Sequence, residues 1–262
     1  MSGLRCILIE RISGKGITFF RGHLIDIVDT LFPEIAMATV MMDLNEIVAK
    51  PKEIIYQRKA EFVIESLKKR NMNACYHRTA VAAVVEICKL IPQQATVALG
   101  GSVSVMQSGL LVALRSMNIE LLDRYRTGIS NDEVERILMR GMSADVLVAS
   151  CNAITADGKL VNEDGRGNRV AGLIFGPKKV ILVVGVNKIV PSVEDGLTRI
   201  KDIAAPLNCI RLGYDTPCTH TGFCDDDNCH PPARACSQIT IIESNRVKDR
   251  LNVFLVGEEL GY

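Results

Sequence analysis

The chain has 262 residues, of which 48% are hydrophobic, and its 31 basic and 30 acidic side chains leave a formal net charge of +1. A chain of this length and apolar content can bury a sizeable core as one large domain. Because the charges are interspersed and nearly balanced, we expect neither nucleic acid nor an anionic membrane as a partner.

The start of the chain has no pattern of a targeting signal or a membrane span. The longest uncharged apolar stretch there, residues 35–42, is much shorter than the roughly 20 residues that cross a bilayer. Acidic side chains interrupt the region that a secretion signal would need. We therefore expect no membrane insertion and a cytoplasmic location. Residues 1–41 fit no folding pattern, and we expect an N-terminal extension or a misplaced start there, followed by a single domain over residues 42–262.

From about Pro51, amphipathic helix patterns alternate with short strand patterns, which is typical of a parallel sheet covered by helices. The first helix should lie across the core through one apolar face, formed by Ile54, Ile55, Phe62, Val63 and Leu67. Strands are predicted at residues 73–76, 96–99, 119–122 and 145–149, and helices at residues 80–90, 103–115 and 132–140.

The second half adds a hairpin and more of the sheet. Asp157-Gly158 between two short β-prone runs predicts a projecting β-hairpin over residues 152–163. A short helix should run through Phe175, a buried central strand should follow at residues 179–184, and a helix capped by Ser192 should end before Pro206. Two β-prone runs, 239–243 and 252–256, should complete the sheet or pair at its edge. The fold class is thus α/β, with an open, mainly parallel sheet and flanking helices.

Glycines and serines follow the predicted strand at residues 96–99. Gly100 and Gly101 would let the backbone approach an anion, and Ser102 and Ser104 stand at the start of the next helix. Ligands of open α/β sheets bind beyond the carboxyl ends of the strands, so a phosphate or carboxylate would suit this loop. The alternative is a tight turn in which Ser102 or Ser104 is an ordinary N-cap.

A polar segment follows the strand at residues 145–149. Asn152 comes soon after this strand, and Asn168 and Arg169 begin a helix further along. The dipole at a helix start disfavours a cation, so Arg169 is a candidate ligand-binding residue rather than a simple turn residue. The alternative for the asparagines is ordinary turn chemistry.

Asn187 and Lys188 follow the most apolar strand directly. If this strand and the one that precedes Gly100 are neighbours, both side chains would face the same crevice as the glycine loop. The alternative is a solvated loop lysine. We expect these residues, with the glycine loop, Asn152 and Arg169, to bind a small anionic ligand.

Four cysteines occur within a short segment, residues 218–236. Cys218, Cys224, Cys229 and Cys236 could supply four thiolates for zinc or an iron–sulfur cluster. Their spacing matches neither paired CxxC zinc knuckles nor the bacterial ferredoxin run, so the spacing does not identify the metal. The alternatives are a loop of reduced cysteines or one or two oxidised pairs.

Histidines and aspartates are interleaved with these cysteines. His220 and His230 could replace one or two thiolates as ligands. The aspartates at residues 225–227 would repel anionic thiolates and argue against a site made of all four. The remaining cysteines lie in apolar surroundings, which suits a reducing compartment.

Several segments together resemble one family: GGSVS, then SCNAITADGKLVNEDGRGNRVAGLIFGPKKVILVVGVNKIV, then AAPLN, TPC, TGFC, CSQITIIE and the terminal VGEELGY. From Pro51 to Tyr262 the chain resembles the bacterial lactate-utilisation (LUD) domain family, in particular its compact single-domain members similar to lactate-utilisation protein C. The resemblance implies a fold similar to that of ribose-phosphate isomerase, glucosamine-phosphate deaminase and the CoA transferases. Gln107 stands where relatives commonly have a glutamate, which puts a carboxylate-dependent mechanism there in doubt.

The resemblance also implies a function. It predicts a subunit or accessory protein in the oxidation of L-lactate or a related organic acid, working beside iron–sulfur partner subunits. Two alternatives remain: an independent enzyme acting on a sugar phosphate or CoA ester, and a metal- or redox-responsive binding module centred on the cysteines. A homo-oligomer is compatible with each of them. The residues identify no acid–base pair, so whether the chain is itself an enzyme is open.

Overall fold

The structure is a computed structural model that describes residues 33–262. The predicted extension at residues 1–41 therefore lies outside the described residues, except for the start of one helix. By its contacts the chain divides into two compact units, residues 1–54 and 55–262. The described part of the first unit is the beginning of helix α3 (Pro33–Lys69), which contains Pro51 in its interior. None of the described helices combines the length and the apolar character that crossing a membrane requires.

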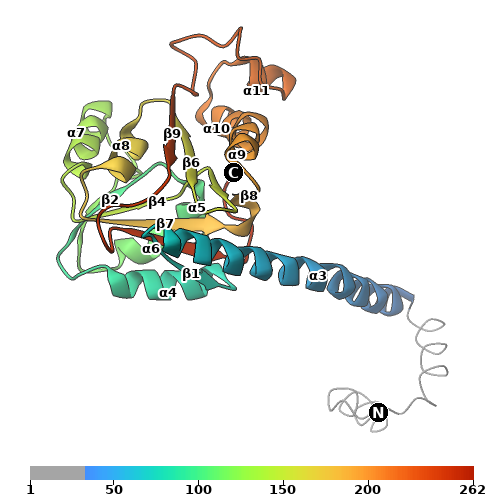
Figure 1. Cartoon of the computed structure of the whole chain (residues 1–262). Helices are drawn as coiled ribbons and strands as arrows, with labels where there is room; N and C mark the ends of the chain where they lie inside the picture. Colours follow the sequence, from blue (N-terminus) through green and yellow to red (C-terminus); the bar gives the residue numbers. More distant parts are fainter. Residues whose placement is uncertain (1–32) are drawn as a thin grey trace. The chain divides into compact units, whose positions relative to one another are not determined.

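Six parallel strands form the main sheet of the second unit, in the order β1-β10-β7-β4-β2-β3 (Figure 1). This confirms the predicted α/β class and the mainly parallel sheet. The strands are β1 (Asn73–His77), β2 (Thr96–Leu99), β3 (Glu120–Leu122), β4 (Val146–Ala149), β7 (Lys179–Gly185) and β10 (Leu251–Val256).

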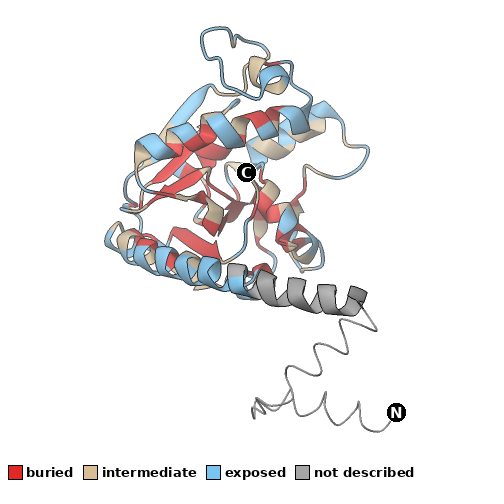
Figure 2. Cartoon of the chain, turned by 90° about the vertical axis from the view of Figure 1, so that its right-hand side faces the viewer, coloured by how far each residue is buried: buried red, intermediate tan, exposed pale blue. Residues whose placement is uncertain are grey.

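Side chains of the central strand β7 alternate between two buried layers, as a strand covered on both faces requires. Val180, Leu182 and Val184 belong to one apolar cluster, and Ile181 and Val183 belong to another on the opposite face. Figure 2 shows the buried residues concentrated in the strands and on the inner sides of the helices. This two-faced burial explains why the strand reads as a continuous apolar run.

Helices supply the outer layers on both faces of the sheet. One cluster includes residues of α4 (Ala80–Leu90), α5 (Val103–Gln107) and α6 (Leu110–Arg115). The other includes residues of α3, α7 (Asn131–Gly141) and α8 (Asn168–Ile174). Within α3 the buried face is formed by Ala60, Val63 and Leu67. Ile54, Ile55 and Phe62, which were expected on that face, are exposed, so the helix contacts the core by a narrower stripe than predicted.

The predicted hairpin forms the middle of a second, four-stranded sheet in the order β8-β5-β6-β9. Its strands are β5 (Ala153–Thr155), β6 (Leu160–Asp164), β8 (Ile189–Val190) and β9 (Gln238–Ile242). The turn residue Gly158 has a φ of +87°, and a Cβ there would lie 2.8 Å from the backbone carbon of Ser66 in α3. The turn therefore needs glycine both for its conformation and for its packing on the helix.

The helix expected to end before Pro206 does not end there. It runs from α9 (Val193–Arg199) through a π-helical turn (Ile200–Ala204) into α10 (Ala205–Leu212). Pro206 lies at the start of α10, where its missing N–H costs least after the change in hydrogen-bond register. Helix α11 (Pro217–Thr221) and a long loop then lead to β9.

Candidate functional site

A crevice with a volume of about 130 Å³ opens beyond the carboxyl ends of three adjacent strands, β7, β4 and β2. Gly101 and Ser102 follow β2, Ser150 and Asn152 follow β4, and Lys188 follows β7. The three strands run parallel, so their carboxyl ends bring these loops to the same edge of the sheet. The strands that precede Gly100 and Asn187, β2 and β7, are not neighbours as the sequence analysis supposed, because β4 lies between them. Gly101 and Lys188 nevertheless line the same crevice.

Lys188 is the buried cation of this crevice, with 4% of its surface exposed. Its Nζ donates to Ser104 Oγ at 2.8 Å, to the Cys151 carbonyl at 3.2 Å and to Ser150 Oγ at 3.3 Å. All three acceptors are neutral, and no carboxylate among the described side chains pairs with this ammonium. Burial lowers the pKa of Lys188 to about 7.

Arg169 also lines the crevice, but its guanidinium is engaged by the protein itself. It forms a buried ion pair with Asp164, with Nη2 and Oδ1 2.7 Å apart. Its other donors reach Asn152 Oδ1, Asn162 Oδ1 and the Ser150 carbonyl at 2.7 to 2.8 Å. Asp164 further accepts the backbone N–H of Arg169 at the start of α8, which explains how a cation is tolerated at this helix end. Arg169 therefore orders the loops around the crevice.

The C-terminal segment closes one side of the crevice, which Tyr262 lines. Asn187 Oδ1 accepts the N–H of Leu260 at 3.1 Å, and Ser104 Oγ donates to the Leu260 carbonyl. Gln107 Oε1 accepts the N–H of Gly261 at 2.6 Å. Gln107 thus serves as an acceptor for the chain end, a task for which an amide is as suitable as a carboxylate.

The predicted ligand-binding residues divide into two groups. Five of them line the crevice: Gly101, Ser102, Asn152, Arg169 and Lys188. The other four, Gly100, Ser104, Asn168 and Asn187, are not among its lining residues. Gly100 is needed for packing, because a Cβ there would lie 2.7 Å from Cβ of Ala149.

Sequence reasoning missed Glu163 as a site residue. Its side chain lines the crevice and is only 3% exposed. Oε1 lies 3.3 Å from Nζ of Lys201, while within the described chain Oε2 is buried without a hydrogen-bond partner. A buried carboxylate oxygen with unused acceptor capacity suits a donor group on a ligand. The signal available in the sequence was its place among the polar residues after Asn162.

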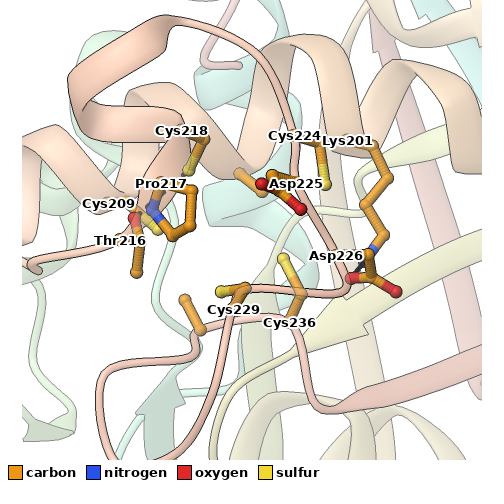
Figure 3. Close-up of a pocket in the computed structure, with 12 residues that line it drawn as sticks. Lys201, Cys209, Thr216, Pro217, Cys218, Cys224, Asp225, Asp226, Cys229 and Cys236 are labelled. Atoms are coloured by element: carbon orange, nitrogen blue, oxygen red, sulfur yellow. Dashed lines mark hydrogen bonds and ion pairs between the residues drawn. The ribbon is translucent and has the colours of Figure 1, made fainter.

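A second cavity, the cysteine pocket, is lined by five thiol-bearing residues: Cys209, Cys218, Cys224, Cys229 and Cys236. Cys209 lies on α10, Cys218 on α11, and the other three on the loop that leads to β9. In Figure 3 the thiols of Cys218 and Cys224 point toward the space from one side, and that of Cys236 points into it from the other. The structure thus brings the four predicted thiols to one cavity and adds Cys209, which the sequence placed among the scattered cysteines.

One of the aspartates near these thiols, Asp226, is compensated by cations. Asp226 pairs with Lys201 at 3.1 Å and with Arg234 at 2.7 Å. His220 and His230 are not among the lining residues, and Nε2 of His220 lies 2.6 Å from Asp215 Oδ1. Histidine replacement of a thiolate is therefore not favoured by this arrangement.

None of the eight cysteines within residues 33–262 forms a disulfide. Burial raises the pKa of Cys236 to about 12 and that of Cys209 to about 11. In the described part of the chain, no three histidine, cysteine or acidic side chains converge on a single ion position. Deprotonating these thiols would thus need a compensating cation or cluster.

The crevice and the cysteine pocket adjoin each other. Cys236, Ala235 and Ala205 line both of them. Lys201, which lines the cysteine pocket, contacts Glu163, which lines the crevice. A group bound in one cavity would therefore lie next to the wall of the other.

The fold and the crevice define an α/β protein whose candidate ligand site lies at the carboxyl ends of a parallel sheet. The LUD domain model matches residues 60–256, which is most of the chain. The chain therefore belongs to the lactate-utilisation (LUD) domain family, as the resemblance predicted. It is also similar to the crystal structure of a DUF162 family protein from Deinococcus radiodurans, with 17% identity and a TM-score of 0.43, over 78% of this chain and 98% of that chain. No curated protein matches the chain.

Proposed function

We propose that the crevice binds the carboxylate of a small organic acid, and that the chain is a subunit or accessory protein in the oxidation of L-lactate or a related 2-hydroxy acid. The observation that carries this proposal is Lys188. A buried ammonium is costly unless an anion pairs with it, yet the described partners of Lys188 are all neutral. Because Lys188 lines an open crevice, an incoming carboxylate can supply the missing charge.

The neighbouring groups suit such a ligand. The contacts of Lys188 Nζ to Ser150 Oγ and the Cys151 carbonyl are long, at 3.3 and 3.2 Å, so a carboxylate can replace them with shorter, charge-assisted bonds. Asn152 is held by Arg169 through its oxygen, which leaves its amide nitrogen for orienting the ligand. In the proposed function, iron–sulfur partner subunits would receive the electrons from the oxidised acid.

Glu163 extends the proposal from a carboxylate to a 2-hydroxy acid. Its Oε2, which has no hydrogen-bond partner within the described chain, is an acceptor for a hydroxyl hydrogen. A 2-oxo acid carries no hydrogen there to donate. Lys201 holds the other oxygen of the carboxylate. Glu163 and Lys188 would then recognise the two ends of L-lactate, the hydroxyl and the carboxylate.

Isothermal titration calorimetry with L-lactate and pyruvate tests the proposal. Lys188→Met should weaken the binding of both acids at least tenfold, because it removes the charge that pairs with their carboxylate. Lys89→Met is the matched control, since Lys89 forms an exposed pair with Glu86 on α4. Equal affinities for the wild type and Lys188→Met, or the absence of binding to either acid, would contradict the proposal. Titration with phosphate and CoA in parallel tests the alternative of a sugar-phosphate or CoA-ester enzyme.

A further inference from the structure

The cysteine pocket is held in shape by protein contacts around the loop that carries three of its thiols. Arg234 donates from Nε to the Cys236 carbonyl at 2.6 Å and from Nη1 to the Cys229 carbonyl at 2.9 Å. The same guanidinium reaches Asp226, whose carboxylate also contacts Lys201. One side chain thus fixes the backbone at two of the thiols without any bond between sulfurs.

The thiols of the cysteine pocket come from different segments of the chain and face a common space. Cys218 is near the start of α11, where Thr216 Oγ1 lies 3.2 Å from its sulfur. Cys224 and Cys236 come from opposite ends of the loop and point toward the same space (Figure 3). The thiols therefore surround the space from several sides.

We propose that the cysteine pocket binds an iron–sulfur cluster through Cys218, Cys224, Cys229 and Cys236. Four thiolates are the usual ligands of such clusters. In a four-iron cluster each thiolate binds its own iron, so thiols that stand around a space fit it better than thiols that share one zinc ion. Lys201 and Arg234, which also pair with Asp226, lie close enough to the pocket thiols to favour their charged forms.

Cys209 is the fifth thiol but is not assigned as a ligand. It is 1% exposed, and it lies behind Thr216 in the view of Figure 3. Its thiol interacts with that of Cys218, which is one of the four assigned ligands. Substitution of Cys209 therefore tests whether the four assigned cysteines are the ligands.

The proposal does not rest on the ligand of the crevice, although it has a consequence for it. Cys236 lines both cavities, so a cluster held by this residue would lie beside the crevice. A redox-active group in the cysteine pocket would then lie next to the candidate substrate site. The chain would then carry part of the electron path itself, in addition to any partner subunit.

The test uses the full chain, purified without oxygen and supplied with ferrous iron and sulfide. We expect about four iron and four sulfide per chain, a broad visible absorption and an electron paramagnetic resonance signal after reduction with dithionite. Alanine in place of Cys218, Cys224, Cys229 or Cys236 should remove most of the iron. Cys209→Ala and the matched control Cys88→Ala, which changes a half-buried thiol on α4, should retain it.

Three outcomes would overturn the proposal: one zinc per chain without sulfide, no bound metal after reconstitution, or equal iron loss in Cys88→Ala. The resonance spectrum of the wild type decides the matter even where an alanine variant misfolds. The Lys188→Met variant separates the two proposals, because it should bind iron normally while losing affinity for lactate. Failure of lactate binding with a full cluster would count against the proposed function alone.

Discussion

Lys188 Nζ lies 2.8 Å from Ser104 Oγ inside the fold, and this hydroxyl in turn donates to the Leu260 carbonyl. The hydrogen-bond partners of this lysine among the described side chains and backbone groups are thus neutral. Burial is the main reason that its pKa is lowered to about 7; Cys151 opposes this change, and the nearby cations Arg199 and Arg169 contribute to it. In the unfolded chain a lysine has a pKa of about 10.4.

This difference predicts how Lys188→Met alters stability with pH. Between about pH 7 and pH 10 the unfolded chain binds the extra proton, so the contribution of Lys188 to the free energy of unfolding rises with pH. Below about pH 7 both states are protonated and the full cost of burying the ammonium remains, on the order of 4 kcal/mol. Lys188→Met should therefore be more stable than the wild type at low pH, and its advantage should shrink toward pH 10.

Urea denaturation of both proteins at about pH 6, 8 and 10 measures this difference. The two proteins share every other titrating group, so the difference between their free energies of unfolding reports on Lys188 alone. Parallel pH profiles would show that the lysine is not buried as a strained cation. They would also remove the observation on which the proposed anion site rests.

Glu163 should discriminate hydroxy acids from acids without a hydroxyl. We expect Glu163→Met to weaken L-lactate binding by about 10- to 100-fold, which corresponds to one lost charge-assisted hydrogen bond of about 1.5 to 3 kcal/mol. Propionate, which has no hydroxyl, should lose little affinity in the same variant. Calorimetric titration of the two acids against the wild type and Glu163→Met provides the measurement. An equal loss for both acids would indicate that Glu163 only shapes the crevice.

The two glycines after β2 should respond differently to alanine. Gly100→Ala should destabilise the protein by about 1–3 kcal/mol, because the new Cβ would lie 2.7 Å from Cβ of Ala149 and 3.3 Å from Cγ of Arg169. Gly101→Ala should change the stability by no more than about 0.5 kcal/mol, since its nearest new contact is Arg124 Nη2 at 3.4 Å. Thermal unfolding of the two variants tests the contrast, and similar melting temperatures would contradict it.

Much of the main sheet could be predicted from sequence because local signals determine it. A strand buried on both faces, such as β7, reads as a continuous apolar run, and Gly158 marks the hairpin turn through a conformation that glycine favours. The place of β10 between β1 and β7 could not be predicted. Its pairing joins Asn73 to Asn252, and no local pattern encodes a contact over that separation.

In the candidate site, too, local sequence signals could be read, whereas contacts between distant segments could not. Gly101, Ser102, Asn152 and Lys188 directly follow or lie close to strand ends, so their position in the sequence indicated the crevice. The meeting of Cys209 with the later cysteines depends instead on how α10 and the loop pack. Helix continuation through Pro206 also escaped prediction, because a π-helical turn shifts the hydrogen bonds just before it. For Gln107, only the folded chain end reveals that its partner is the N–H of Gly261.

The sequence predicts that Arg169 binds a ligand, whereas in the structure its guanidinium pairs with Asp164. Substitution of Arg169 distinguishes these two roles. Arg169→Met should destabilise the protein by about 3–5 kcal/mol, because it leaves Asp164 buried without its cation and removes the donors to Asn152 and Asn162. Arg166→Met is the matched control three residues away, where the pair with Glu135 is exposed and its loss should have little effect. Urea denaturation of the two variants measures the contrast. If Arg169→Met were as stable as Arg166→Met but lost lactate binding, the arginine would contact the ligand directly, as its sequence position first suggested.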